Sequence, residues 1–118
     1  MADLTMAKAL NLALREALAE DPKTILLGQD VGQDEGVFRI SEGLLKEFGA
    51  DRIIDFPVAE SAIVGVAIGL CFAGFRPIAE MQFSGFGYHG FHQIENHASR
   101  FRNRTRGRLT CPMVVRMP

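Results

Sequence analysis

The sequence is short of cysteine, of net charge and of long hydrophobic runs, and each shortage narrows the class of protein. Its 118 residues include two cysteines, Cys71 and Cys111. Both lie in apolar stretches and lack the spacing of a metal site or of a redox motif. We therefore expect reduced thiols in the core of a cytoplasmic protein of prokaryotic type, since no targeting segment is visible.

Charge and hydropathy imply neither a nucleic-acid partner nor a membrane partner. Lysine and arginine total 13 against 14 acidic residues, so the net charge of −1 favours neither nucleic acid nor a membrane surface. The longest apolar run, residues 62–73, is too short to cross a bilayer. There is no repeat or low-complexity segment. With 47% hydrophobic residues, the composition is that of one globular domain.

Hydrophobic periodicity predicts helices and strands that alternate along the chain. Helices are expected at residues 4–20, 41–49, 59–73 and 90–103, and strands at 24–28, 52–56, 76–83 and 113–117. This order predicts a three-layer α/β domain with a mainly parallel sheet and helices on both faces. The last strand stops where a functional loop normally follows, which suggests a truncated domain.

Glu60 stands at one of three loops that such a sheet would place at its ligand-binding edge. Spacing alone favours a first-turn acid that complements the helix dipole. The functional alternative is a carboxylate set in an apolar environment, where it can share a proton. The helix behind it is apolar all round, so we expect it to be buried. Because Gly65 and Gly69 share one face, a subunit interface is predicted there.

Two stretches resemble nucleotide-binding and calcium-binding motifs but lack features that those motifs require. The glycine pattern of residues 85–90, GFGYHG, follows a strand, yet not the first strand of the fold, and no acidic residue follows the next one. Its aromatic members, Phe86 and Tyr88, favour a stacking wall. The acidic stretch at residues 30–36, DVGQDEG, lacks the turn glycine and final glutamate of a calcium loop.

Histidines and arginines gather in the second half of the chain. His92 and Glu95 are three residues apart on a predicted helix and could share a metal, but no second such pair exists in the sequence. Surface or interface histidines are therefore favoured. Arginines alternate through residues 100–108, RFRNRTRGR, and could bind phosphate. The low net charge favours a solvated segment or an interface with an acidic partner.

Several longer stretches resemble one family. The stretches are ILLGQDVG, GVFRISEGLLKEFGADRIIDFPVAESAIVGVAIGL, RPIAEMQFSGF, GFHQI and RTRGR with PMVVRMP. They resemble the β chain of thiamine-diphosphate-dependent 2-oxo-acid dehydrogenases of the pyruvate and branched-chain type. The resemblance implies a transketolase-like pyrimidine-binding domain over residues 1–118, as the N-terminal portion of a longer β chain.

The resemblance also implies site residues. Glu60 matches the glutamate that hydrogen-bonds the pyrimidine ring nitrogen of thiamine diphosphate and so activates the cofactor. Phe86 matches the aromatic that packs on the pyrimidine, and Gln82 matches a position that lines the same pocket. Met113 matches a position whose backbone carbonyl binds a structural potassium in some relatives.

The implied activity is oxidative decarboxylation of pyruvate or a branched-chain 2-oxo acid, with acyl transfer to a lipoyl group. The implied partners are an α chain, in an α2β2 tetramer, and a lipoyl-bearing acyltransferase core, without nucleic acid or membrane. The α chain would supply magnesium, because this sequence has no Gly-Asp-Gly diphosphate motif. It also lacks the family's histidine loop, so the segment alone is expected to be inactive. The Gly65 helix resembles one buried between subunits.

Three residues depart from the family pattern. Gln29, Phe56 and His92 stand where relatives usually have Glu, Thr and Asp. The missing acids belong to polar positions near the path proposed to link two active sites. The departures leave open a non-catalytic assembly or regulatory fragment that binds an α chain without completing a site. A nucleic-acid binder that uses the arginine strip is a weaker alternative.

Overall fold

Four parallel strands form the centre of the molecule. The computed structural model describes residues 3–118, and its sheet has the strand order β2-β1-β3-β4. All three pairings are parallel, which confirms the predicted α/β architecture. The strands are β1 (Thr24–Gln29), β2 (Ile53–Phe56), β3 (Arg76–Glu80) and β4 (Val114–Arg116).

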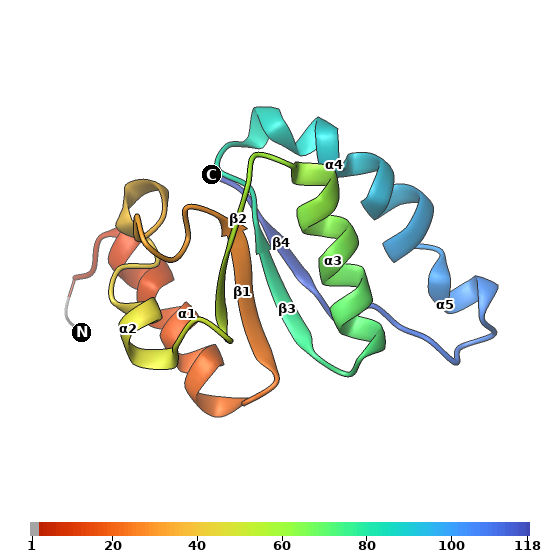
Figure 1. Ribbon diagram of the computed structural model, residues 1–118, viewed down its shortest axis with the longest axis horizontal. Coiled ribbons are helices and arrows are strands. Elements are labelled where there is room, and N and C mark those ends of the chain that lie inside the picture. Colours follow the sequence, from red (N-terminus) through yellow and green to blue (C-terminus); the bar gives the residue numbers. More distant parts are fainter. Residues whose placement is uncertain (1–2) are drawn as a thin grey trace.

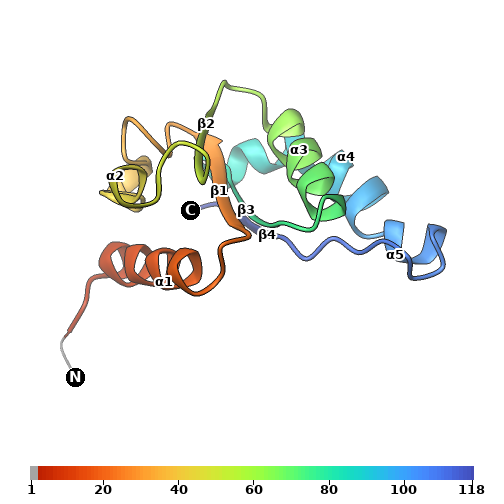
Figure 2. The ribbon, with the colours of Figure 1, turned by 60° about the horizontal axis from the view of Figure 1, so that its bottom comes forward.

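Helices cover both faces of this sheet, so the three predicted layers are present. Figure 1 and Figure 2 show α1 (Met6–Glu20) and α2 (Leu44–Phe48) on one face and α3 (Glu60–Phe72) with α4 (Gly87–Gln93) on the other. Shorter helical segments complete the chain. These are η1 (Val37–Arg39), η2 (Ser84–Phe86), the π-helical turn η3 (Ile94–Ala98) and α5 (Phe101–Arg104).

The buried strand β1 divides the core into two layers. Leu26 packs in a cluster with residues of α1 and α2, whereas Ile25 and Leu27 pack in a cluster with α3. Successive side chains of a strand point to opposite faces, so one apolar run serves both layers. All three side chains are less than 5% exposed. The continuous apolar sequence of β1 is therefore what a central parallel strand requires.

Helix boundaries differ from the predicted ones where side chains or glycines intervene. The helix expected at 41–49 begins at Leu44, because Gly43 adopts a left-handed conformation with φ of 78°. The helix expected at 90–103 begins earlier, at Gly87, and is interrupted. The hydroxyl of Ser99 donates to the carbonyl of Glu95 at 2.5 Å, and this local bond accompanies the π-helical turn and the break before α5.

The helix α3 is not buried all round, contrary to the sequence-based expectation. Its inward residues are Glu60, Ile63, Val64, Ala67, Ile68 and Cys71. On the opposite side Val66 is 41% exposed, and a methyl group placed on Gly65 or Gly69 would meet no atom within 4 Å. An apolar helix face is thus open, because this chain alone supplies a layer for only one side. The subunit interface stays a prediction.

The cysteines and the membrane prediction can be compared with the structure directly. Cys71 is buried and Cys111 is half-buried, both as free thiols. Burial raises the pKa of Cys71 to about 11 and also raises the pKa of Cys111. Both thiols are therefore protonated at neutral pH, as expected of inert packing residues. Within residues 3–118, no helix has the length and hydropathy to cross a membrane.

An ion pair joins the last two strands on the α1 side of the sheet. Glu80 is 1% exposed and pairs with Arg116, its register partner on β4. Gly28 makes room for it, because a methyl group there would lie 2.5 Å from the carbonyl oxygen of Glu80. Burial raises the pKa of the Glu80 carboxyl, and the Arg116 charge opposes that shift. The pair thus ties β4 to the core.

We predict that Arg116→Met destabilises the chain by about 3–5 kcal/mol at pH 7, because a buried carboxylate loses its partner. The folded-state pKa of Glu80 is raised above its unfolded value near 4.5, so protonation favours the folded state. The loss should therefore shrink as the pH falls toward 4.5. Urea unfolding at several pH values measures it.

Arg76→Met is the matched control, because Arg76 forms an ion pair with Asp21 while its side chain is 69% exposed. An exposed pair contributes less than about 1 kcal/mol, so this variant should remain close to wild type. Equal destabilisation by the two variants would contradict the role assigned to the buried pair.

Candidate functional site

Glu60 is a buried carboxylate at the edge of the sheet where the strands end. The strand β2 ends at Phe56, and three residues later Glu60 begins α3. The residue is 8% exposed. Its carboxylate has no hydrogen bond or ion pair to any other group in residues 3–118. The one wholly buried, unpartnered polar side-chain atom in that part is Oγ of Ser41, so the carboxylate oxygens of Glu60 still reach solvent.

The two interpretations of Glu60 can both hold. The first turn of α3 has no side-chain cap, so a carboxylate there complements the exposed N–H groups and the helix dipole. An exposed acid would complement the helix dipole equally well, so this role does not explain why Glu60 is only 8% exposed. Buried polar groups are normally paired, and an unpaired one at a strand-end edge is a place where a ligand can supply the partner.

Gln82 lies near this edge on the adjacent segment that follows β3. Its amide nitrogen Nε2 donates to Oδ2 of Asp30 at 2.7 Å. Asp30 directly follows β1, so the bond joins the ends of two neighbouring strands. Sequence reasoning did not single out Asp30. The feature of the sequence that could have identified Asp30 is its position, as a charged residue immediately after a buried strand.

Phe86 belongs to a row of exposed aromatic rings. It is 39% exposed and lies edge-on to Phe83, with ring centroids 5.9 Å apart. Phe83 in turn lies edge-on to Phe38, at 6.5 Å. Edge-to-face contacts of this kind hold rings in fixed orientations. The row offers an apolar wall that includes Phe86, and Phe38 extends it onto the loop after β1. Tyr88, the other aromatic of the predicted stacking wall, is 85% exposed and makes no ring contact with the described residues, so the stacking role stays a prediction.

Two glycines bring α4 close to the edge. A methyl group on Gly90 would lie 2.7 Å from Cε of Met81 and 3.4 Å from the carbonyl oxygen of Glu60. One on Gly87 would lie 2.8 Å from Sδ of Met117. These glycines of the GFGYHG stretch serve close packing, a role that the sequence analysis did not assign. Gln93 of α4 also donates to the hydroxyl of Ser61 on α3, at 3.3 Å.

The loop after β1 is held against the end of β2. The Asp55 carboxylate accepts from the backbone N–H groups of Gly32 at 2.6 Å and Gln33 at 3.0 Å. A methyl group on Gly32 would lie 2.7 Å from this carboxylate, so Asp55 or the loop would have to shift. The backbone N–H groups of Gly32 and Gln33, within the acidic stretch at residues 30–36, are thus engaged in contacts with Asp55.

Other sequence-based candidates lie apart from this edge. Met113 precedes β4 and so lies at the opposite edge of the sheet from Glu60. Glu95 pairs with Arg100 at 2.6 Å, and the described residues contain no group of three metal-binding side chains of the types His, Cys, Asp or Glu. Phe101 packs on Phe72, which places the arginine-rich segment at the far end of α3.

Comparison with known proteins identifies the domain type. The family model of the transketolase pyrimidine-binding domain matches residues 2–118. A pyruvate dehydrogenase E1 component subunit beta from Leifsonia xyli is 52% identical over 115 residues, which are 98% of this chain and 34% of the relative. A 3-methyl-2-oxobutanoate dehydrogenase subunit beta from Mycobacterium tuberculosis is 50% identical, over 98% of this chain and 33% of the relative. The chain thus spans about a third of the length of the curated relatives it matches.

The close contact at Gly90 leads to a prediction about packing. Gly90→Ala should destabilise the chain by about 1–3 kcal/mol, because the added methyl group overlaps the buried side chains of Met81 and Val64, so that either these side chains or α4 must shift. Gly69→Ala is the matched control on the open face of α3, where it should stabilise the helix by about 0.5–1 kcal/mol. Thermal unfolding of both variants measures these changes. Destabilisation by Gly69→Ala but not by Gly90→Ala would refute the close packing of α4 at Gly90.

Proposed function

Because this chain belongs to the family of transketolase pyrimidine-binding domains, we propose that it forms the pyrimidine half of a thiamine diphosphate site in the β chain of a 2-oxo-acid dehydrogenase. The substrate would be pyruvate or a branched-chain 2-oxo acid. Relatives named for pyruvate and for 3-methyl-2-oxobutanoate are similar to this chain at 52% and 50% identity, so both substrates are kept. Residues 1–118 would form one domain of that longer protein.

The observation that carries the proposal is the unpartnered, 8% exposed carboxylate of Glu60 at the strand-end edge. Such a carboxyl group can share a proton with a weak ring base when water is largely excluded. The ring of Phe86, 39% exposed, can support one face of an aminopyrimidine. The side chains present therefore fit the pyrimidine of thiamine diphosphate.

Within this site Glu60 would hold a proton between its carboxyl group and the pyrimidine nitrogen, and Phe86 would orient the ring. Gln82 would line the same pocket. When bound, thiamine diphosphate supplies the carbon nucleophile that attacks the 2-oxo acid. A bound ring would cover the carboxylate oxygens of Glu60, which reach solvent in this chain, and would so keep water from competing for the proton.

The partners are proposed on the same basis. An α chain would bind the diphosphate through magnesium in an α2β2 tetramer, and a lipoyl-bearing acyltransferase core would receive the acyl group. The open apolar face of α3, around Gly65, Val66 and Gly69, is the surface we assign to subunit contact. A structural potassium at the carbonyl of Met113 remains a proposal, as does a cytoplasmic location. No nucleic-acid or membrane partner is proposed.

A second candidate function is a non-catalytic assembly module. Gln29 and Phe56, which depart from the family pattern, are register partners at the ends of β1 and β2. Two neighbouring positions, which relatives usually occupy with Glu and Thr, therefore both differ in this chain, beside the loop that leads to Glu60. A module of this kind would bind the α chain without supporting turnover.

We predict that Glu60→Gln, in the full-length chain assembled with its α chain, lowers decarboxylation by at least about a hundredfold. An amide cannot share a proton as a carboxyl group does, while its similar shape should leave assembly intact. Glu20→Gln, the same change at an exposed position of α1, is the control and should retain activity. Carbon dioxide release and size-exclusion chromatography measure the two properties.

Wild-type turnover in Glu60→Gln would exclude the catalytic role of Glu60. An assembly that forms with the wild-type chain but neither binds thiamine diphosphate nor releases carbon dioxide would support the assembly module instead.

The open face of α3 gives a separate prediction. Val66→Glu places a charge at a 41% exposed position and should abolish association with the α chain without unfolding this chain. Leu12→Glu is a matched control on α1, where Leu12 is 43% exposed. Analytical ultracentrifugation of the mixed chains measures association. If Val66→Glu still assembles as the control does, the interface lies elsewhere.

A further inference from the structure

The contact between Asp30 and Gln82 carries an inference about the chemistry that Gln82 can offer a ligand. We propose that Asp30 is a positioning residue, which directs the carbonyl oxygen of Gln82 away from the loop and leaves it as a hydrogen-bond acceptor for a ligand at the strand-end edge. The inference rests on the function proposed above and adds a residue that neither the sequence analysis nor the family match singled out. Asp30 follows β1 and Gln82 follows β3, and their bond of 2.7 Å is partly buried.

The orientation of the amide follows from the chemistry of its partner. An ionised carboxylate has no hydrogen to donate, so only the NH2 group of Gln82 can face Asp30. The carbonyl oxygen Oε1 is then directed away from Asp30, and it accepts no hydrogen bond from the rest of residues 3–118. A glutamine without such a partner could present either end of its amide. Asp30 therefore selects the acceptor end.

A ligand with an N–H donor is what this orientation recognises. The aminopyrimidine of thiamine diphosphate carries an exocyclic amino group, whose hydrogens can be donated to a carbonyl oxygen. The presented Oε1 of Gln82 would accept one of them. The analogue oxythiamine diphosphate has a ring carbonyl in place of the amino group, so its oxygen would meet the oxygen of Gln82 unfavourably.

Asp30 is itself held in an uncommon backbone conformation. Its φ of 57° lies in the left-handed region, which Asp and Asn adopt more readily than other residues with a side chain. Its carbonyl accepts from the N–H of Gly36 at 2.8 Å, and the following residue, Val31, is fully buried. The carboxylate thus projects from a fixed point of the loop.

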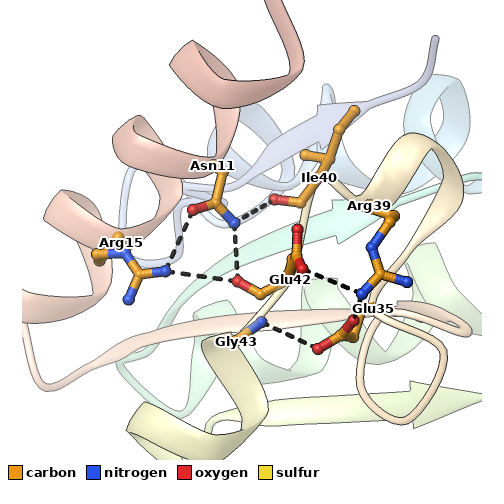
Figure 3. Close-up of polar contacts among 7 residues, drawn as sticks. All are labelled: Asn11, Arg15, Glu35, Arg39, Ile40, Glu42 and Gly43. Atoms are coloured by element: carbon orange, nitrogen blue, oxygen red, sulfur yellow. Dashed lines mark hydrogen bonds and ion pairs between the residues drawn. The ribbon is translucent and has the colours of Figure 1, made fainter.

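The rest of the loop is tied to α1 by side chains, as Figure 3 shows. The amide nitrogen of Asn11 donates to the carbonyl oxygens of Ile40 at 2.8 Å and Glu42 at 3.0 Å. Arg15 donates to Oδ1 of Asn11 at 3.2 Å, which fixes that amide in turn. Asn11 and Gln82 are therefore both oriented by a charged partner. Asn11 presents its oxygen to Arg15, whereas Gln82 presents its NH2 group to Asp30.

A second group of contacts closes the loop on itself. Glu35 accepts from the N–H of Gly43 at 3.4 Å and pairs with Arg39, and Arg39 also pairs with Glu42 at 3.1 Å. These links join the beginning and end of the loop, while Asp55 holds its first turn. Asp30 is consequently pre-organised before any ligand arrives, which is the condition for orienting Gln82 without cost at binding.

The test compares cofactor binding with and without the carboxylate that fixes the Gln82 amide. In Asp30→Asn the new side chain can either donate to Oε1 of Gln82 or accept from its NH2 group, so Gln82 loses the single orientation that the carboxylate imposes. Because Asn tolerates the left-handed backbone, the loop should keep its shape. In the full-length chain assembled with its α chain, we expect about tenfold weaker binding of thiamine diphosphate with magnesium, and a shift of preference toward oxythiamine diphosphate.

The double variant Asp30→Asn with Gln82→Glu should restore the wild-type preference. The amide introduced by Asp30→Asn would donate to one oxygen of the carboxylate introduced by Gln82→Glu. The other oxygen of that carboxylate would again be an acceptor in the site, at unchanged net charge. Asp34→Asn, the same substitution at an exposed position of the loop, is the control and should bind as wild type does. Isothermal titration calorimetry gives both dissociation constants, and circular dichroism verifies folding.

The outcomes separate the inference from the proposed function. Equal binding of thiamine diphosphate by wild type and Asp30→Asn would overturn the role of Asp30 and leave the cofactor site standing. Equal weakening toward both ligands, without recovery in the double variant, would show a structural role only and would also overturn it. An assembled wild type that binds neither ligand would remove the proposed function, and the inference with it.

Discussion

The parallel register of the sheet is the constraint on which the candidate site depends. Gly28 of β1 is paired with Asp55 of β2 and with Glu80 of β3, so the three strands end at one edge. The segments that follow them carry Asp30, Glu60 and Gln82, which lie far apart in the sequence. A shift of one residue in either pairing would turn these side chains to other faces, because the side-chain period of a strand is two. The buried, β-branched and leucine-rich interior of β1 fixes that register by packing on both faces.

Acidic side chains near the sheet differ in what they contact, and this difference separates two carboxylates with structural partners from the candidate site residue Glu60. Glu80 is buried but paired with Arg116, and Asp55 accepts from two backbone N–H groups. Both are explained by the fold, because each has the partners that a carboxylate needs. Glu60 is nearly as buried as Glu80 yet has no such partner within the described residues. Burial alone would not have separated these residues. The missing partner does, since it leaves a hydrogen-bonding capacity that a ligand can satisfy.

The helix α3 connects the candidate site to an open apolar face. Its first residue is Glu60, one side of it packs on the sheet, and Gly90 allows α4 to approach its N-terminus closely. Its other side is apolar and open around Val66 and Gly69. A subunit that packed on this open face would bury the remainder of α3 and further restrict water near Glu60. Contact between chains and protection of the carboxylate would then depend on the same helix.

The sequence by itself determined the α/β class, the strand and helix order, and the family, because hydrophobic periodicity and long matching stretches are local properties of the chain. It also marked Glu60, Gln82 and Phe86, through resemblance. Only the tertiary structure decided that α3 has an open face, that Gly87 and Gly90 serve packing, and that Asp30 faces Gln82. The last pair is separated by 52 positions in the sequence, and no spacing rule relates them. Such contacts arise when parallel strands are placed side by side, and strand order is set by how whole layers pack rather than by any local pattern.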